Sequence, residues 1–183
     1  MQRALVDRAK RGDGEAFDAL ARTVGDRCMA IASRILRDRD LAEDAVQAAL
    51  ITAWRELRSL RDPDRFEPWL HRILTNACYA EARRRRRWSA EIRVLPPARH
   101  FSPDEILTVE DRDQLERAFR RLTLEQRAVL VFHHFLGLPV SEVADRLDIP
   151  IGTARSRLHH ATTALRASLE ADARTPTTQE RPA

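Results

Sequence analysis

The chain has 183 residues, enough for one domain or two small ones. Hydrophobic residues make up 43% and charged residues 33%, which is typical of soluble helical bundles, and only 5 glycines with few β-branched runs argue against a large sheet. The formal net charge is only +4, and Lys10 is the one lysine among 32 basic residues. The distribution of the arginines along the chain is therefore more informative about binding partners than the total charge.

Apolar residues at helical spacing predict four helices in the N-terminal half. Gly12-Asp13-Gly14 and Asp38-Arg39-Asp40 break this pattern, and Asp40 is suited to cap the third helix. A loop stiffened by Pro63 separates the third and fourth helices. The expected helices span residues 2–11, 15–37, 41–57 and 66–87.

The helix at 41–57 has two different faces. Ala42, Ala45, Val46, Ala49, Ala53, Trp54 and Leu57 are expected to pack inward. The outward face carries polar residues around one apolar side chain: Asp44, Gln47, Ile51, Arg55 and Arg58. Such a face is either simply solvated or a surface for a partner.

The helix at 66–87 buries a stripe made of Phe66, Trp69, Leu70, Ile73, Ala77 and Ala80. Its other side carries Arg72, Asn76 and Tyr79, followed by five consecutive arginines at 83–87. Five arginines at a helix end complement the helix dipole, and they also suit phosphate groups. Tyr79 and Asn76 are suited to stack on and hydrogen-bond unpaired bases.

Helical periodicity is lost after Trp88, where Pro96, Pro97 and Pro103 appear. We therefore expect an all-α chain of two small domains joined by a flexible linker. A helix from about Asp104 to Leu122 would open the second domain, and a polar tail after Leu169 is expected to be disordered. The predicted divisions are residues 1–88, a linker at 89–103, a second domain at 104–170 and a tail at 171–183.

The stretch Leu122–Leu169 predicts three helices, and the last two form a helix-turn-helix. Val140, Val143, Ala144 and Leu147 give a short amphipathic helix, for which Ser141 is the expected N-cap. Pro150 must end this helix, and Thr153 is expected to cap the next. The buried stripe of that last helix is Ala154, Leu158, Ala161, Leu165 and Leu169.

The opposite face of the last helix carries Arg155, Ser156, His159 and His160 near its start. A recognition helix enters the major groove with its first turns, and arginine can bind guanine through two hydrogen bonds. The alternative is a solvated face on an ordinary helical hairpin.

Other kinds of site have little support in the sequence. There is no glycine-rich phosphate loop, no GxSxG and no HExxH motif. Cys28 and Cys78 lie on predicted apolar faces without CxxC or CxxH spacing, so we expect buried thiols. The pairs His133-His134 and His159-His160 diverge on a helix, so each should have one packed and one exposed ring. No catalytic residue, metal site or cofactor is expected. No apolar run suits a membrane span or signal peptide, so we expect a cytoplasmic protein.

Several segments together resemble bacterial RNA polymerase sigma factors of the extracytoplasmic-function (ECF) group. They are LAEDAVQAALITAWREL, FEPWLHRILTN with its basic end, LTLEQRAVL and SEVADRLDIPIGTARSRLHHA, and the resemblance spans roughly Asp13 to Leu169. It implies a sigma factor, not an enzyme, that binds the β and β′ subunits of core RNA polymerase and promoter DNA. An anti-sigma partner is also implied.

The resemblance implies roles residue by residue. Trp69 matches a packed tryptophan of the family, and the linker would pass through polymerase. The residues implied to bind core polymerase are Asp44, Gln47, Ile51 and Arg55. Those implied at the −10 promoter element, where a base is flipped out, are Arg61, Asp62, Arg65, Arg72, Asn76, Tyr79, Arg83 and Arg84. Those implied at the −35 element are Thr153, Arg155, Ser156, Arg157, His159 and His160.

Two other hypotheses remain on the sequence alone. A free-standing helix-turn-helix regulator would bind duplex DNA tightly without polymerase. A metal-dependent enzyme would need to use some of the six histidines.

Overall fold

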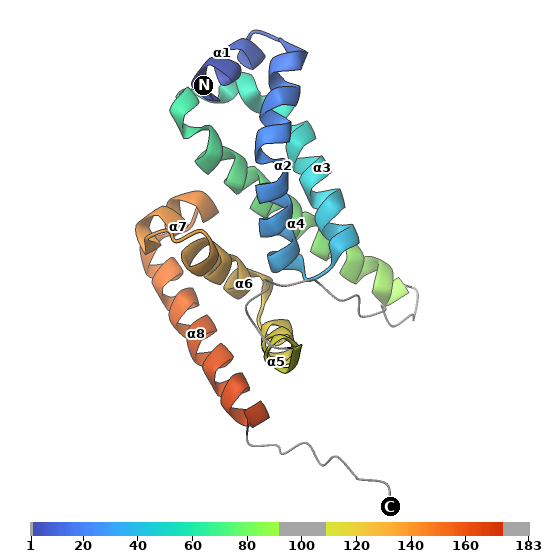
Figure 1. The fold of residues 1–183 in the computed structure, drawn as a ribbon, viewed down its shortest axis with the longest axis vertical. Coiled ribbons are helices and arrows are strands. Elements are labelled where there is room, and N and C mark those ends of the chain that lie inside the picture. Colours follow the sequence, from blue (N-terminus) through green and yellow to red (C-terminus); the bar gives the residue numbers. More distant parts are fainter. Residues whose placement is uncertain (1, 92–108, 174–183) are drawn as a thin grey trace, which may run out of the picture.

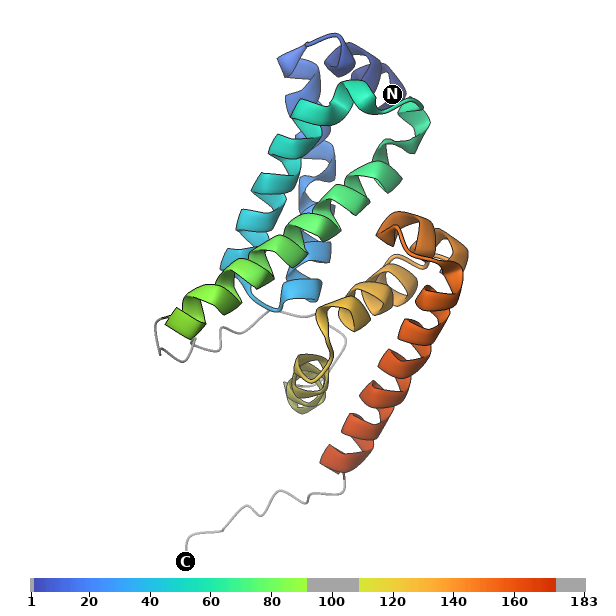
Figure 2. The same cartoon turned by 180° about the vertical axis from the view of Figure 1, so that it is seen from behind.

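The computed structural model describes residues 2–91 and 109–173, and every regular element in these two segments is helical. The helices form two groups, with the N-terminal group in blue to green and the C-terminal group in yellow to red (Figure 1). The view from behind shows α4 running diagonally between the rest of the N-terminal group and the C-terminal group (Figure 2). The all-helical expectation is confirmed for the described residues.

The N-terminal group packs three long helices with one short helix at their end. Its members are α1 (Gln2–Lys10), α2 (Gly14–Leu36), α3 (Arg39–Glu56) and α4 (Phe66–Glu91), with the short 3₁₀ turns η1 (Leu57–Ser59) and η2 (Pro63–Arg65) between α3 and α4. Asp13 caps α2 by accepting a hydrogen bond from the Ala16 amide at 3.0 Å. The four expected helices are confirmed.

The cap of α3 differs from the expected one. Asp38, with extended backbone, accepts a hydrogen bond from the Leu41 amide at 3.1 Å. Asp40 therefore lies inside the first turn, where its charge still complements the helix dipole. The sequence offered two aspartates two residues apart, and only the backbone angle at the break selected between them.

The buried core of the N-terminal group differs from the expected stripes at two positions. Ala80 is exposed, whereas Leu74 is fully buried, because α4 packs against α2, α3 and also α7. Trp54 stays 39% exposed and lies against the ring of Phe17, with 5.0 Å between centroids. Both predicted positions were wrong because a single-face pattern cannot describe a helix with neighbours on two sides.

The two cysteines are buried free thiols, as predicted. Burial raises the pKa of Cys28 to about 12 and that of Cys78 to about 12. A thiol with such a pKa stays protonated at neutral pH and is a poor nucleophile.

The C-terminal group contains the predicted helix-turn-helix. Its members are α5 (Val109–Arg120), α6 (Leu124–Leu130), a π-helical segment η3 (Val131–Phe135), α7 (Val140–Leu147) and α8 (Ile151–Ala173). α7 ends where Asp148 adopts the left-handed conformation at φ 54°, two residues before Pro150.

Both predicted caps in this motif were wrong by the same kind of error. Pro139 stands at the N-cap of α7, so Ser141 lies within the first turn and is exposed. α8 begins at Ile151, so Thr153 is its third residue. The extended backbone at the N-cap of α7 suits a proline as well as a hydroxyl residue, so composition favoured the wrong residue there.

Two features of the C-terminal group were not anticipated. Thr123 and Gln126 form a reciprocal capping box at the start of α6. The end of the same helix widens into the π-helical η3, and Gly137 closes it at φ +68°. The threonine–glutamine spacing was readable in the sequence, whereas nothing local signals a π-helix.

The prediction that each histidine pair has one packed and one exposed ring is confirmed for one of the two pairs. His133 is half-buried, with its Nδ1 2.7 Å from the Leu138 carbonyl oxygen, and His134 is exposed. His159 and His160 are both exposed, so the prediction was wrong there. Nothing packs over that side of α8 within the described residues.

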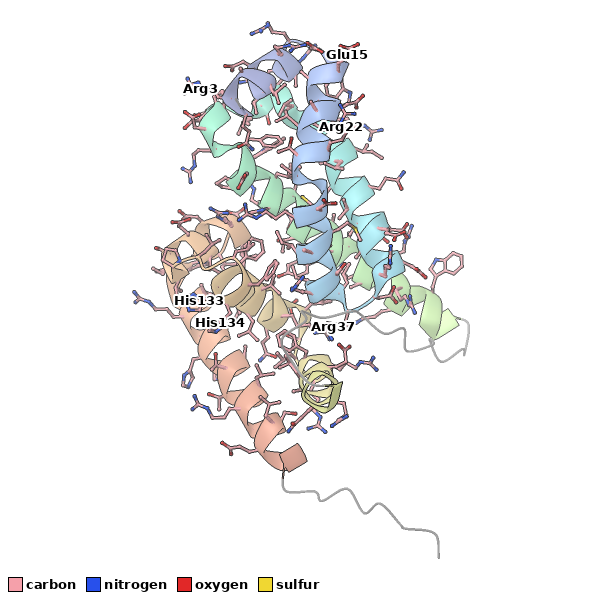
Figure 3. The ribbon with its side chains drawn as sticks, viewed as in Figure 1. Arg3, Glu15, Arg22, Arg37, His133 and His134 are labelled. Carbon is pink, nitrogen blue, oxygen red and sulfur yellow. The ribbon has the colours of Figure 1, made fainter. Side chains whose placement is uncertain are left out.

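The two groups share one continuous buried core. α7 packs against α4, and α6 with η3 packs against α2. Arg37 marks the lower end of α2, where this end faces α5 and α6 (Figure 3). α4 continues to Glu91, three residues into the segment expected to be linker, and α8 continues to Ala173. The rest of the expected linker, the start of the helix expected at 104 and most of the expected tail lie outside the described residues.

No helix in the described segments has both the length and the apolar character required to cross a membrane.

Candidate nucleic-acid interface

The first candidate surface is the outward side of α3. Asp44, Gln47, Ile51 and Arg55 are all exposed there, and Ile51 is 46% exposed. Beside it lies an open hollow of about 360 Å³ between α2 and α3, lined partly by Phe17, Leu50, Ile51 and Trp54. An exposed apolar patch with a polar rim is typical of protein–protein contact. We call this surface the α3 face.

The arginine run of α4 is tied to α3 by ion pairs. Arg84 lies 3.0 Å from Asp44 and 2.8 Å from Glu81, and Arg85 lies 2.9 Å from Asp38. The predicted polymerase-binding Asp44 and the predicted DNA-binding Arg84 are thus direct partners. Arg83, Arg86 and Arg87 are exposed. The run therefore both fastens α4 to α3 and presents cations to solvent.

The second candidate surface surrounds the turn between α3 and α4. An open hollow of about 310 Å³ brings together predicted site residues from the turn and the start of α4. Its lining is Leu60, Arg61, Asp62, Arg65, Pro68, Trp69, Arg72 and Asp145. Trp69 is half-buried in the wall, and the three arginines are exposed. A hollow with one aromatic wall and several cations suits an unstacked base and its phosphates. We call it the turn hollow.

Asp62 also shapes the turn itself. Its side chain accepts a hydrogen bond from the Asp64 amide at 3.0 Å and caps η2. One carboxylate oxygen is therefore engaged locally, which limits what Asp62 offers to DNA. Asn76, one helical turn beyond Arg72, is exposed as expected.

Contacts from α1 hold the turn between α3 and α4 in place, a role that sequence reasoning missed. The Lys10 ammonium donates a hydrogen bond to the Leu60 carbonyl at 2.5 Å, and Arg3 forms an ion pair with Asp64. Figure 3 shows Arg3 beside the turn. These partners lie 50 and 61 residues apart in the chain, so no local pattern could have revealed them.

Tyr79 was expected to be exposed on the outer side of α4, and this prediction was wrong. It is half-buried, and burial raises its pKa to about 12. The charges of Glu125 and Arg157, both from the C-terminal group, also act on its hydroxyl. In this arrangement Tyr79 belongs to the contact between the two groups.

The third candidate surface is the start of α8. Arg155, Ser156, His159 and His160 are exposed side by side over its first turns, as predicted. Thr153 and Arg157 are half-buried. The exposed set is the part that can enter a major groove without rearrangement.

His71 is a site that sequence reasoning missed. It is 2% exposed, and Arg146 of α7 donates a hydrogen bond to its Nδ1 at 3.0 Å. The Phe132 ring lies edge-on with 5.5 Å between centroids. Burial, and then the Arg146 charge, lowers the pKa of His71 from 6.5 to about 3. The imidazole is therefore neutral and accepts from a cation of the other group.

The pKa of His71 predicts an acid-sensitive contact between the two groups. In the unfolded chain His71 binds a proton at about pH 6.5, whereas in the folded chain it does so only at about pH 3. The free energy of unfolding therefore falls as the pH drops through this window. By pH 5 the loss is about 2 kcal/mol. Urea denaturation at pH 7.5 and pH 5 measures it, with His71→Gln as a neutral comparison. Equal pH dependence in both proteins would contradict the assignment.

Among the described residues, no group of three or more histidine, cysteine, aspartate or glutamate side chains is arranged to hold a metal ion.

Each of the two helical groups matches a known protein family. The model of Sigma-70 region 2 matches residues 20–88, and that of Sigma-70 region 4 matches residues 112–165. The chain is 31% identical to the RNA polymerase sigma-H factor of Pseudomonas aeruginosa, covering 91% of this chain and 92% of the relative. It is 30% identical to the ECF RNA polymerase sigma-E factor of Escherichia coli, covering 88% and 90%.

Solved structures agree with these relatives. The sigma factor RpoE of Bartonella quintana, solved with the anti-sigma factor NepR, has a TM-score of 0.71 at 26% identity, covering 85% of this chain and 98% of that one. A structure of CnrH with the cytosolic domain of CnrY has a TM-score of 0.66 at 26% identity, covering 93% and 98%. With both regions present in order and relatives matched over nearly their whole length, the chain belongs to the ECF group of sigma factors, which direct RNA polymerase to initiate transcription.

Proposed function

We propose that this sigma factor uses its three surfaces for three partners. The α3 face docks on core RNA polymerase through Asp44, Gln47, Ile51 and Arg55. The turn hollow and the outer side of α4 hold the −10 element. The start of α8 reads the −35 element. In this proposal residues 1–88 and 104–170 act as separate modules joined by the segment at 89–103.

The observation that carries the proposal is that the three surfaces differ in chemistry. The α3 face has an apolar centre around Ile51, whereas the turn hollow and the start of α8 are rich in arginine and histidine. Two weak DNA contacts on one chain reinforce each other through effective concentration once polymerase positions both modules. A single free-standing helix-turn-helix would not need the α3 face or the turn hollow.

The turn hollow supplies what a flipped base requires. Taking a base out of the stack costs about a few kcal/mol, which stacking and phosphate contacts must offset. Trp69 and the arginines at 61, 65 and 72 line the same hollow. This sigma factor performs no catalytic step in the proposal. In the proposal it works in the cytoplasm and binds an anti-sigma protein. Support comes from the B. quintana RpoE structure, in which that relative is in complex with the anti-sigma factor NepR.

Transcription with purified components tests the proposal. Core RNA polymerase supplied with this chain should produce run-off transcripts from genomic promoter fragments, and neither component should do so alone. Sequencing the transcript ends then defines the promoter. Failure to bind core polymerase, together with tight binding of one operator by the chain alone, would contradict the proposal.

Arg155 provides a test at the −35 element. Arg155→Ala should weaken promoter binding by the holoenzyme by about 1–3 kcal/mol and relax the base preference at one position, because a bidentate contact to a base is lost. Competition binding with single-base promoter variants measures both effects. Arg166→Ala, an exposed arginine three turns further along α8, is the matched control and should keep the base preference. An unchanged preference in Arg155→Ala would exclude Arg155 as a reader.

A further inference from the structure

The turn between α3 and α4 contains three residues, 60–62, that belong to neither η1 nor η2. At its start, the buried Leu60 donates its amide to the Leu57 carbonyl at 3.2 Å. At its end, the Asp62 carbonyl accepts from the Arg65 amide at 3.0 Å. The direction of Arg61, between these two fixed points, therefore depends on how the peptide group that joins it to Leu60 is oriented.

Lys10 of α1 fixes that peptide group from outside the turn. Its half-buried ammonium donates a hydrogen bond to the Leu60 carbonyl oxygen at 2.5 Å. This carbonyl and the Arg61 amide belong to one rigid plane, so holding the oxygen fixes the direction in which the chain continues. A charged donor also makes a stronger hydrogen bond than a neutral one. The contact therefore orients Arg61, which lines the turn hollow.

α1 is itself anchored to the N-terminal group. It lies at the end of that group, next to the turn, in both views (Figures 1 and 2). Val6 and Ala9 are buried in the core. Arg8 lies 2.7 Å from Asp13, whose other carboxylate oxygen caps α2. The place of the Lys10 ammonium is therefore set by α2 and the core, and the turn adapts to it.

A second contact from α1 reaches the other end of the turn. Arg3 forms an ion pair with Asp64, whose amide donates to the Asp62 side chain. Both members of the pair are more than half exposed, so this pair should contribute less than the Lys10 contact. Together the two contacts hold the turn at residues 60 and 64, on either side of Asp62.

The chemistry of lysine suits this position. Lys10 is the one lysine among 32 basic residues. A compact ammonium on a flexible stem can direct one donor at a single carbonyl oxygen, whereas a planar guanidinium suits the paired oxygens of a carboxylate or phosphate. The neighbouring Arg8 binds a carboxylate, and Lys10 binds a carbonyl.

We propose that Lys10 is a positioning residue for the −10 contact, and that its hydrogen bond to the Leu60 carbonyl sets the base preference of the turn hollow. The inference rests on the proposed function, because it takes the turn hollow as the −10 surface. Lys10 itself contacts no base. It acts through Arg61 and Asp62, whose direction decides which base edges they can reach.

Three variants test this role. Lys10→Met removes the ammonium and leaves a side chain of similar length. Arg11→Met is the matched control, because it removes one positive charge from the next residue, which is exposed. Arg3→Gln acts on the other end of the turn and should give a smaller effect in the same direction. Urea denaturation checks that each variant is folded.

Hydrogen exchange of the free chain reports on the turn without any DNA. The amides of Leu60, Asp64 and Arg65 are hydrogen-bonded within the turn. In Lys10→Met they should exchange about threefold to tenfold faster, because a charged hydrogen bond that restrains the turn is lost. The amides of α2 should keep their rates, and so should the turn of Arg11→Met. Unchanged exchange at the turn in Lys10→Met would overturn the inference.

Selection from randomised DNA reports the base preference. Holoenzyme made with each variant binds a promoter fragment, mapped by run-off transcription, whose −10 element is randomised, and the bound fraction is sequenced. Lys10→Met should bind the preferred −10 sequence about threefold to tenfold more weakly and the other sequences equally well. Arg11→Met should keep the preference. Equal weakening of every sequence would indicate a phosphate contact by Lys10 and would overturn the inference.

The unaltered chain separates this inference from the proposed function. If its holoenzyme selects no −10 sequence, the proposed function fails and the inference fails with it. If it selects one, and Lys10→Met selects the same sequence equally strongly despite faster exchange, only the inference fails.

Discussion

Ile51→Glu is expected to weaken binding to core RNA polymerase by about 2–4 kcal/mol, because it places a charge at the apolar centre of the α3 face. Ile51 is 46% exposed in the free chain and borders the hollow formed with Phe17 and Trp54. In the free protein a glutamate there stays in water and suits a helix. The free energy of unfolding should therefore change by no more than about 0.5 kcal/mol.

Titration of labelled chain with core polymerase measures this loss, and urea denaturation checks the fold. Ala4→Glu is the matched control, since it adds the same charge at an exposed position of α1. It should bind core polymerase like the unaltered chain. Equal binding by Ile51→Glu would show that the α3 face is a solvated face and nothing more.

Phe132→Ala is expected to lower the free energy of unfolding by about 3–5 kcal/mol, since it empties a fully buried aromatic position. Phe132 lies in the π-helical segment and packs on His71 of α4, so its ring belongs to the core shared by both groups. The variant should therefore lose packing within the C-terminal group and between the groups at once.

Phe135, three residues further along, is a control within the same segment. It is 41% exposed and lies under the Arg34 guanidinium, with 3.8 Å to the ring centroid. Such a contact contributes about 0.5–1 kcal/mol, so Phe135→Ala should cost much less than Phe132→Ala. Urea denaturation followed by circular dichroism compares them. Similar losses would mean that the position 132 ring is not the centre of the shared core.

The sequence predicted the helices of the N-terminal group and the helix-turn-helix because each has a strong local signal. Apolar residues recur at helical spacing in α2, and Pro150 rules out continuation of α7. Exposure of the α3 face and of Arg155 followed from the same periodicity. Caps were less predictable, since Asp38 competed with Asp40, and Pro139 with Ser141, at nearly the same place.

Roles that depend on contacts between distant segments were not predictable. Asn76 and Tyr79 lie three residues apart on α4, yet one is exposed and the other half-buried by the C-terminal group. No local pattern indicated a partner for Lys10, whose ammonium binds the Leu60 carbonyl 50 residues away. His71 lies in the quoted segment FEPWLHRILTN, but no local pattern indicated its role.

The sequence by itself determined the two helical modules and three of their surfaces: the face of α3, the arginine-rich side of α4 and the reading face of α8. It could do so because helical periodicity and turn chemistry act over a few residues. Only the tertiary structure decided that α7 lies on α4, with Asp145 and Asp148 against Arg65 and Arg72. That choice depends on the burial of His71, Phe132 and the Arg37–Glu116 pair, whose partners are far apart in the chain. Local patterns contain no information about which distant surfaces will exclude water together.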